Sequence, residues 1–234
     1  MVLKWKRDLH PLLSLSGGLL LGVAFLDLLP EALTRGIAER LEISTVLGAT
    51  LLAIVGFHIL DKVFAVHAHH DHAHGEPGEH CENERHGKTP AYARATGMII
   101  HSFFDGLAIG GGFAVDPKLG LLVTLAVVMH DFSDGMSTVT ILKNALGHES
   151  KALFPMLALD AIAPFIGAIV GSALAPNASV IAIMLAVFSG FFIFLSLSEL
   201  LPQAHAGKLS RKMGVFLTIL GIVIVFIFRS IAPV

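Results

Sequence analysis

Seven long apolar stretches dominate this sequence of 234 residues, and each is long enough to cross a lipid bilayer. About 20 consecutive apolar residues span the hydrocarbon core as a helix. The stretches are too long and too continuous for the alternating strands of a membrane barrel. We place them at residues 12–30, 44–66, 92–115, 119–142, 152–175, 178–201 and 213–231. The sequence therefore predicts an all-α fold, a polytopic membrane helical bundle with seven transmembrane helices.

The charged residues agree with this class and orient the bundle. Only 15% of the residues are charged, whereas soluble domains have about 25%. With the N-terminus in the cytoplasm, twelve of the 16 Lys and Arg residues fall inside and four outside, which is the bias expected of a membrane protein. The inside set is Lys4, Lys6, Arg7, Lys62, Arg85, Lys88, Arg94, Lys143, Lys151, Lys208, Arg211 and Lys212. We expect an integral, multi-pass protein of a plasma (inner) membrane, with an organelle membrane as the alternative.

Two near-copies of one polar motif lie inside consecutive apolar stretches. The first reads HSFFDG from His101, and the second reads HDFSDG from His130. Each motif has His and Asp at i and i+4, as in His101 and Asp105, so the imidazole and the carboxylate share one face of a helix. Ionisable groups at membrane depth are costly and usually functional. Two such pairs on neighbouring helices can converge on one divalent cation, which predicts an intramembrane metal site.

A histidine-rich segment separates the second and third stretches. Residues 67–88 read HAHHDHAHGEPGEHCENERHGK and show no apolar periodicity. Imidazoles bind Zn, Cu, Ni and Fe, so a dense tract of them can buffer metal without a fixed geometry. Its histidines are His67, His69, His70, His72, His74, His80 and His86. The predicted organisation is therefore 1–66 with two transmembrane helices, 67–90 as a cytoplasmic His-rich loop, and 91–234 with five transmembrane helices.

The chain also repeats one pattern in opposite directions across the membrane. A Ser-Gly pair at Ser16 precedes Asp-Leu-Leu-Pro at 27–30, and a Ser-Gly pair at Ser189 precedes Glu-Leu-Leu-Pro at 199–202. The predicted orientation makes the first of these helices antiparallel to the sixth. Paired segments of opposite direction are typical of inverted-repeat transporters, in which the substrate site lies near the midplane.

These motifs together resemble the ZIP family of divalent metal transporters. HSFFDGLAIG at 101–110 is similar to the family signature HNxxDGLAIG, and HDFSDG at 130–135 is similar to HExPxE followed by Gly. LDLLPEA at 26–32 and SELLPQA at 198–204 resemble the helices that flank the core, and a His-rich loop precedes the first signature in many members. The resemblance implies a membrane transporter that carries metal toward the cytosol through two adjacent metal sites, and not an enzyme.

The family pattern implies a ligand set for each site. The first site takes His101, Asp105, His130 and Asp134. The neighbouring site takes Ser102, Asp105, Asp131, Asp134 and Asp160, so that Asp105 and Asp134 bridge the two ions. A mixed His/Asp shell suits Zn²⁺, and Fe²⁺, Mn²⁺ or Cd²⁺ could fit it as well. The expected partners are a divalent metal ion and the lipid bilayer, with no nucleic acid.

The sequence departs from the family pattern in two respects. Ser102 stands where Asn is usual, and Ser133 stands where Pro is usual. The family has eight spanning helices and LDLLPEA resembles the second, so the first has no counterpart among the seven stretches. In the resemblance, that helix belongs to the moving half of the protein. Two explanations stay open: this is a shortened sequence, or a natural variant closes the gap by forming a homodimer.

Two other functions remain open on sequence alone. A cation-diffusion-type metal exporter also uses His/Asp pairs and a His-rich loop, although its motif helices are not consecutive. A seven-helix membrane zinc hydrolase would use His and Asp to hold a water-activating Zn²⁺. The hydrolase would explain seven helices, but it explains neither the repeat nor the His-rich loop.

Overall fold

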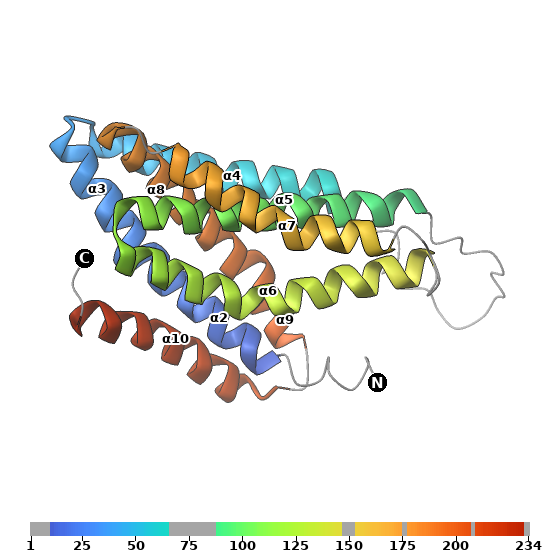
Figure 1. The fold of residues 1–234 in the computed structure, drawn as a ribbon. Helices are drawn as coiled ribbons and strands as arrows, with labels where there is room; N and C mark the ends of the chain where they lie inside the picture. Colours follow the sequence, from blue (N-terminus) through green and yellow to red (C-terminus); the bar gives the residue numbers. More distant parts are fainter. Residues whose placement is uncertain (1–9, 66–87, 147–152, 175–176, 207–208, 232–234) are drawn as a thin grey trace.

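The computed structural model describes residues 10–65, 88–146, 153–174, 177–206 and 209–231, and these residues form a helical bundle (Figure 1). The helices are α2 (His10–Val23), α3 (Leu29–Ala38), α4 (Ile43–Ala65), α5 (Lys88–Val115), α6 (Pro117–Leu146), α7 (Leu153–Ala173), α8 (Ala178–Leu195), α9 (Leu201–His205) and α10 (Arg211–Ile231). Two π-helical turns, Ala24–Leu28 and Ser196–Leu200, join α2 to α3 and α8 to α9. The prediction of an all-α polytopic bundle is confirmed.

Six of the helical rods in the described ranges are long and apolar enough to cross a membrane. They are His10–Ala38, Ile43–Val63, Ala95–Val115, Leu153–Ala173, Ala178–His205 and Arg211–Ile231. α6 is a further rod of 30 residues, and it carries the second His/Asp motif. The starts of α2, α5, α7 and α10 and the end of α6 lie at one end of the bundle (Figure 1), which is the end that the charge distribution predicts to be cytoplasmic.

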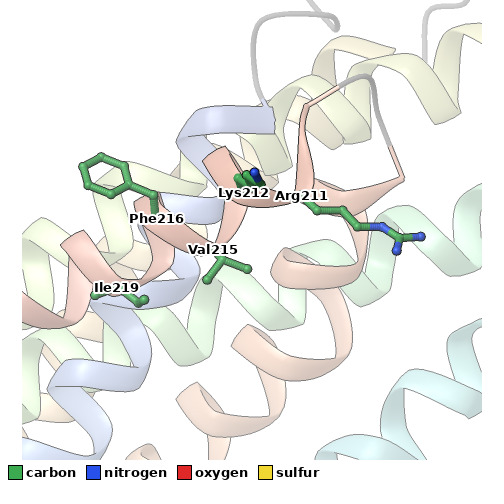
Figure 2. A pocket seen from close by; sticks show the side chains of 5 residues that line it. All are labelled: Arg211, Lys212, Val215, Phe216 and Ile219. Atoms are coloured by element: carbon green, nitrogen blue, oxygen red, sulfur yellow. The ribbon is translucent and has the colours of Figure 1, made fainter.

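The outer surface of the bundle is apolar, as a lipid-facing surface must be. On α10, Val215, Phe216 and Ile219 line a shallow groove, and Arg211 and Lys212 lie at the end where the helix begins, which the charge distribution predicts to be cytoplasmic (Figure 2). Phe216 is 58% exposed and Ile219 is 54% exposed. Basic residues at the cytoplasmic end of an apolar helix fit the predicted orientation.

The centre of the bundle is made by α2 and α8, which run antiparallel (Figure 1). α8 is apolar on all sides, so it is buried rather than amphipathic. Phe191 and Phe192 on α8, together with Leu20 and Leu28 from the α2 segment, are among the largest fully buried side chains in the described ranges. Because these two helices fill the core, the remaining helices pack around them and present their outer faces to lipid.

The two π-helical turns lie directly before the two Leu-Pro pairs. Proline has no N–H, so Pro30 leaves the Leu26 carbonyl without its usual helical donor. Nη1 of Arg229, on α10, donates to this carbonyl, and Nε of Arg229 lies 3.9 Å from Asp27 Oδ1. The widened turn before Pro30 therefore adds one contact between α10 and the α2 segment, beside the hydrogen bond from Thr218 Oγ1 to the Ser14 carbonyl.

The packing of α2 on α8 follows the predicted inverted repeat. Alignment of the two acidic-Leu-Leu-Pro segments places Ser189 opposite Gly17 and Ser196 opposite Ala24. Ser189 Oγ donates to the Ala24 carbonyl at 3.2 Å, and Ser196 Oγ donates to the Gly17 carbonyl at 2.8 Å. The same alignment relates the two residue pairs, although both hydrogen bonds are donated by serines of the α8 segment.

The motif helix α5 packs extremely closely against α7. A Cβ atom at Gly106 would lie 2.0 Å from the Pro164 carbonyl oxygen, and one at Gly110 would lie 2.0 Å from that of Ala168. Small residues allow such backbone contact between membrane helices. Gly135, the counterpart of Gly106 in the second motif, has no atom of a described residue within 4 Å of a Cβ added there. The α5 motif therefore has a helix packed behind it, whereas no described helix covers the corresponding face of α6.

Candidate metal centre

The two motifs meet because α5 and α6 form an antiparallel hairpin that turns at Asp116. His101 and Asp105 project from α5 toward His130 and Asp134 on α6. The Asp105 and His130 residues are fully buried, Asp134 is 7% exposed, and the His101 side chain is 11% exposed. Four ionisable side chains thus converge inside an apolar bundle, where each needs a partner of opposite charge.

The distances among these four groups match those of a metal shell. His101 Nε2 lies 3.3 Å from Asp105 Oδ2 and 3.4 Å from Asp134 Oδ2. His130 Nε2 lies 3.3 Å from Asp105 Oδ2 and 3.9 Å from Asp134 Oδ2. Ligands about 2.0–2.1 Å from a tetrahedral Zn²⁺ are separated by about 3.3–3.4 Å. Ligand atoms of His101, His130 and Asp134 all lie within 4.8 Å of one another, so a small shift would let one ion contact all of them.

A backbone hydrogen bond prepares His130 for this role. Its Nδ1 lies 3.0 Å from the Ala126 carbonyl oxygen, which can only accept a hydrogen bond. Nδ1 therefore carries the proton in the neutral ring, and the Nε2 lone pair faces Asp105 and Asp134. A histidine held by its second ring nitrogen in this way is typical of metal ligands.

Several atoms of the cluster are buried without a hydrogen bond. They are His101 Nε2, Asp105 Oδ1 and Asp134 Oδ2. Leaving a buried polar atom unpaired costs about 1–3 kcal/mol, and more for a charged group. Two of them, His101 Nε2 and Asp134 Oδ2, lie 3.4 Å apart, so a divalent cation between them would satisfy both at once. The donor set fits Zn²⁺ as cargo of this site.

A second polar cluster adjoins the first. Ser102 Oγ donates to Asp160 Oδ1 at 2.9 Å, which links α5 to α7. Ser102 is 3% exposed and Asp160 is 8% exposed. Asp131 is half-buried and interacts electrostatically with Asp105, Asp134 and Asp160. All seven predicted site residues therefore lie in one region, on three helices.

One carboxylate that the predicted ligand set omits also faces the cluster. Glu199, in the π-helical turn Ser196–Leu200, is close enough to His101, Asp134 and Asp61 to interact with them electrostatically. Asp61 is partly exposed and lies near the C-terminal end of α4. In the sequence, Glu199 stands out only because it occupies the place in the inverted repeat that Asp27 occupies in the first copy. No motif spacing relates it to α5 or α6.

Other polar residues take separate places. Asp27 is 5% exposed and lies beside Arg229, in the opposite half of the inverted repeat from Glu199. His205 is exposed, and its Nδ1 lies 2.7 Å from the Leu201 carbonyl oxygen. His58 is exposed on α4, with its ring centroid 6.1 Å from that of Phe194. The predicted His-rich loop at 67–86 lies outside the described residues.

The fold and the site together define a class of protein. Imidazoles and carboxylates lie close together inside a bundle of membrane-crossing helices, as in membrane proteins with an intramembrane site for a divalent metal. Comparison with known proteins narrows this class. The family model for the ZIP zinc transporter matches residues 86–229. The chain belongs to the ZIP zinc transporter family.

Individual relatives agree with this assignment. The chain is 31% identical over 201 residues to the zinc transporter ZupT of Corynebacterium aurimucosum, with 82% of this chain and 74% of that protein covered. It is 25% identical over 231 residues to the zinc transporter YKE4 of Saccharomyces cerevisiae, with 88% and 64% covered. It is 33% identical over 118 residues to the zinc transporter foi of Drosophila melanogaster, and the match spans half of this chain and 16% of that protein.

The family decides between the functions that the sequence left open. Members are transporters and not enzymes, as the relatives' names state. The reading as a membrane zinc hydrolase is therefore set aside, and so is the reading as a cation-diffusion-type exporter. The resemblance drawn from the motifs is confirmed.

Proposed function

We propose that this chain transports divalent metal, Zn²⁺ first, across its membrane toward the cytosol through a binuclear His/Asp site. The observation that carries the proposal is the convergence of His101, Asp105, His130 and Asp134 at spacings close to those of a zinc shell. The names of the relatives support zinc as the cargo.

The geometry suggests how an ion would pass between two positions. Asp105 and Asp134 have oxygens toward the imidazoles, and each also interacts with Asp131 of the second cluster. A shared carboxylate can hold an ion at the first position with one oxygen while the other oxygen contacts the second. Each ligand is then exchanged singly, so the ion is never stripped of all its partners at membrane depth.

Glu199 supports a route onward from this site. It faces His101 and Asp134 and also interacts with Asp61 near the cytoplasmic end of α4. A metal leaving the cluster would meet these two carboxylates before reaching the loop that carries the seven histidines. We propose that this loop buffers metal at the cytoplasmic face, and that the membrane is a plasma (inner) membrane.

The donor set also bears on the choice of metal. The first position offers two imidazoles and two carboxylates, which suit Zn²⁺ and also Fe²⁺, Mn²⁺ or Cd²⁺. We propose that all four enter, with Zn²⁺ bound most tightly among the physiological ions because the Irving–Williams order places it above Mn²⁺ and Fe²⁺.

The direction of transport is tested in cells that lack their own zinc importers. Expression of the wild-type chain should raise cellular zinc and restore growth at low external zinc, whereas the double variant His101→Ala, His130→Ala should do neither. A fall in cellular zinc on expression of the wild type would show export and would overturn the proposed direction. Immunoblots of the membrane fraction check that both proteins insert to the same level.

We further propose a homodimer through the open face of α6. Gly135 has open space around it, and Leu121, Leu125 and Val128 on the same helix are 44–60% exposed. The corresponding face of α5 is covered by α7. Because the motif is duplicated on α6, we expect a helix to cover this face of α6 as well, here from a second copy of the chain. Oxidation of a Val128→Cys variant that also carries Cys81→Ser should give a disulfide-linked dimer in membranes. A purely monomeric product would contradict a dimer through this face.

A further inference from the structure

Thr138 lies one helical turn beyond Asp134 on α6 and is fully buried. Its hydroxyl oxygen has no hydrogen-bond partner. A hydroxyl buried without a partner costs about 1–3 kcal/mol. The cost is greater in a membrane, because no water from outside can reach the group. The hydroxyl lies close enough to the Asp160 carboxylate to interact with it, but no described residue donates a hydrogen bond to its oxygen. The oxygen of Thr138 is therefore a buried donor atom whose lone pairs remain available to a metal ion.

Other threonines in these helices satisfy themselves locally. Thr34, Thr50, Thr124 and Thr218 each donate their hydroxyl to the carbonyl oxygen four residues earlier. This is the usual arrangement for Thr within a helix. Thr138 has the same option toward Asp134 but does not use it. Its hydroxyl lies instead at the edge of the second cluster, beside the Asp160 carboxylate.

The surroundings of Thr138 are those of a metal position. Thr138 is next to Asp160 on α7, and Asp160 in turn accepts the hydrogen bond of Ser102 from α5. Along α6, Asp131, Asp134 and Thr138 occur at i, i+3 and i+7, so they share one helix face. Three helices thus direct only oxygen atoms into this cluster, whereas the neighbouring position has two imidazoles.

We propose that the Thr138 hydroxyl is a donor to the metal at the second position, where it adds to the all-oxygen set of Ser102, Asp105, Asp131, Asp134 and Asp160. This inference rests on the proposed binuclear site and goes beyond its ligand set. An all-oxygen shell suits harder ions such as Mn²⁺ and Mg²⁺, whereas thiolate selects softer ones. Residue 138 is therefore a determinant of which ion occupies the second position.

The test replaces the hydroxyl by a softer donor of similar size. In the full-length chain with Cys81→Ser, which removes the single native cysteine, Thr138→Cys leaves one thiol in the protein. Added Cd²⁺ should displace the thiol proton and give the ultraviolet charge-transfer band of a Cd–thiolate bond, saturating at one ion per chain. Thr50→Cys in the same background is the matched control, because Thr50 is also buried, at 6% exposed, but lies on α4 away from the cluster.

The control should show no band, and neither should Cys81→Ser alone. A missing band in Thr138→Cys, or equal bands at positions 138 and 50, would overturn the inference. The histidine-rich loop does not interfere, since imidazoles give no thiolate transition.

A second arm measures binding in the full-length chain with the seven loop histidines replaced by serine. Thr138→Val should weaken the second ion by at least about 10-fold, as loss of a supporting ligand does elsewhere, and leave the first ion unchanged. Thr138→Ser should restore the second ion, because it keeps the hydroxyl. Unchanged binding of both ions to Thr138→Val would overturn the inference alone. If the parent protein, with serine at the seven loop histidines and Thr138 intact, binds only one ion, the binuclear site itself is overturned. This inference then fails with it.

Discussion

Asp105 is the residue on which the candidate site depends most. Its Oδ2 lies 3.3 Å from both imidazole nitrogens, and its Oδ1 is buried without a partner. In the Asp105→Asn variant, which keeps the shape and removes the charge, Zn²⁺ affinity at the membrane site should fall by more than about 100-fold, since loss of an outer partner alone costs 10–100-fold. Calorimetry on protein whose seven loop histidines are serine measures this.

The matched control for this variant is Glu42→Gln. Glu42 is an exposed carboxylate at the opposite end of the bundle, where it accepts a hydrogen bond from Ser44. Zinc affinity in the control should equal that of the parent protein. An equal loss in both variants, or an unchanged affinity in Asp105→Asn, would contradict the shared-ligand role of Asp105.

Protons should compete with the metal at the same residues. Binding needs His101 and His130 neutral, and the ordinary histidine pKa is about 6.5. Metal is held when these rings have lost their protons, so affinity should be highest at and above neutral pH and should fall as pH decreases through the histidine range. Protons should be released on binding, and calorimetry in two buffers of different ionisation enthalpy detects them. A binding enthalpy independent of the buffer would mean that neither histidine is a ligand.

Sequence spacing predicted the residues that share a helix but not those that meet across helices. The His-x-x-x-Asp pairs follow from one helical turn, so His101 with Asp105 and His130 with Asp134 were predictable from the chain alone. The family resemblance added Ser102 and Asp160. No pattern related Thr138 or Glu199 to the cluster, because their positions depend on how α6, α7 and the π-helical turn pack.

At the scale of helices, Gly106 and Gly135 form a natural comparison. A Cβ at Gly106 would lie 2.0 Å from the Pro164 carbonyl oxygen, whereas one at Gly135 meets nothing within 4 Å. Gly106→Ala must push α7 away from α5, and overpacking of this kind costs about 1–3 kcal/mol. Thermal unfolding in detergent should show a clearly lowered midpoint for Gly106→Ala and little change for Gly135→Ala.

The displacement of α7 should also separate Ser102 from Asp160, so Gly106→Ala should weaken the second ion more than the first. Equal stability of the two alanine variants would mean that the close contact between α5 and α7 is not formed in the protein. A strong effect of Gly135→Ala would show instead that another helix covers that face of α6.

The long helices were predictable from apolar length, but their internal irregularities were not. The expected stretch 12–30 is the start of a longer rod, because the π-helical turn Ala24–Leu28 lets the chain pass Pro30 and continue to Ala38. The same holds for 178–201, which continues through Ser196–Leu200 to His205. A proline in the sequence predicts a break in the helix. The structure shows instead that a π-helical turn before the proline lets the helix continue.

For the whole molecule, the His-rich loop and the membrane site should act separately. Replacement of the seven loop histidines by serine should remove several weakly bound ions and leave the tight membrane site unchanged. Equilibrium dialysis against Zn²⁺ measures both classes of site. Loss of the tight class in this variant would make the loop part of the transport path and would contradict its proposed role as a buffer.

The most direct test of the account is zinc uptake by purified protein in sealed liposomes. Protein carrying serine at the seven loop histidines should move Zn²⁺ across the bilayer, and so should its Glu42→Gln variant. The corresponding Asp105→Asn protein should transport no faster than empty liposomes, because the ion has lost the carboxylate that both imidazoles face. Uptake by the Asp105→Asn protein at the parent rate would contradict the claim that the His/Asp cluster lies in the transport path.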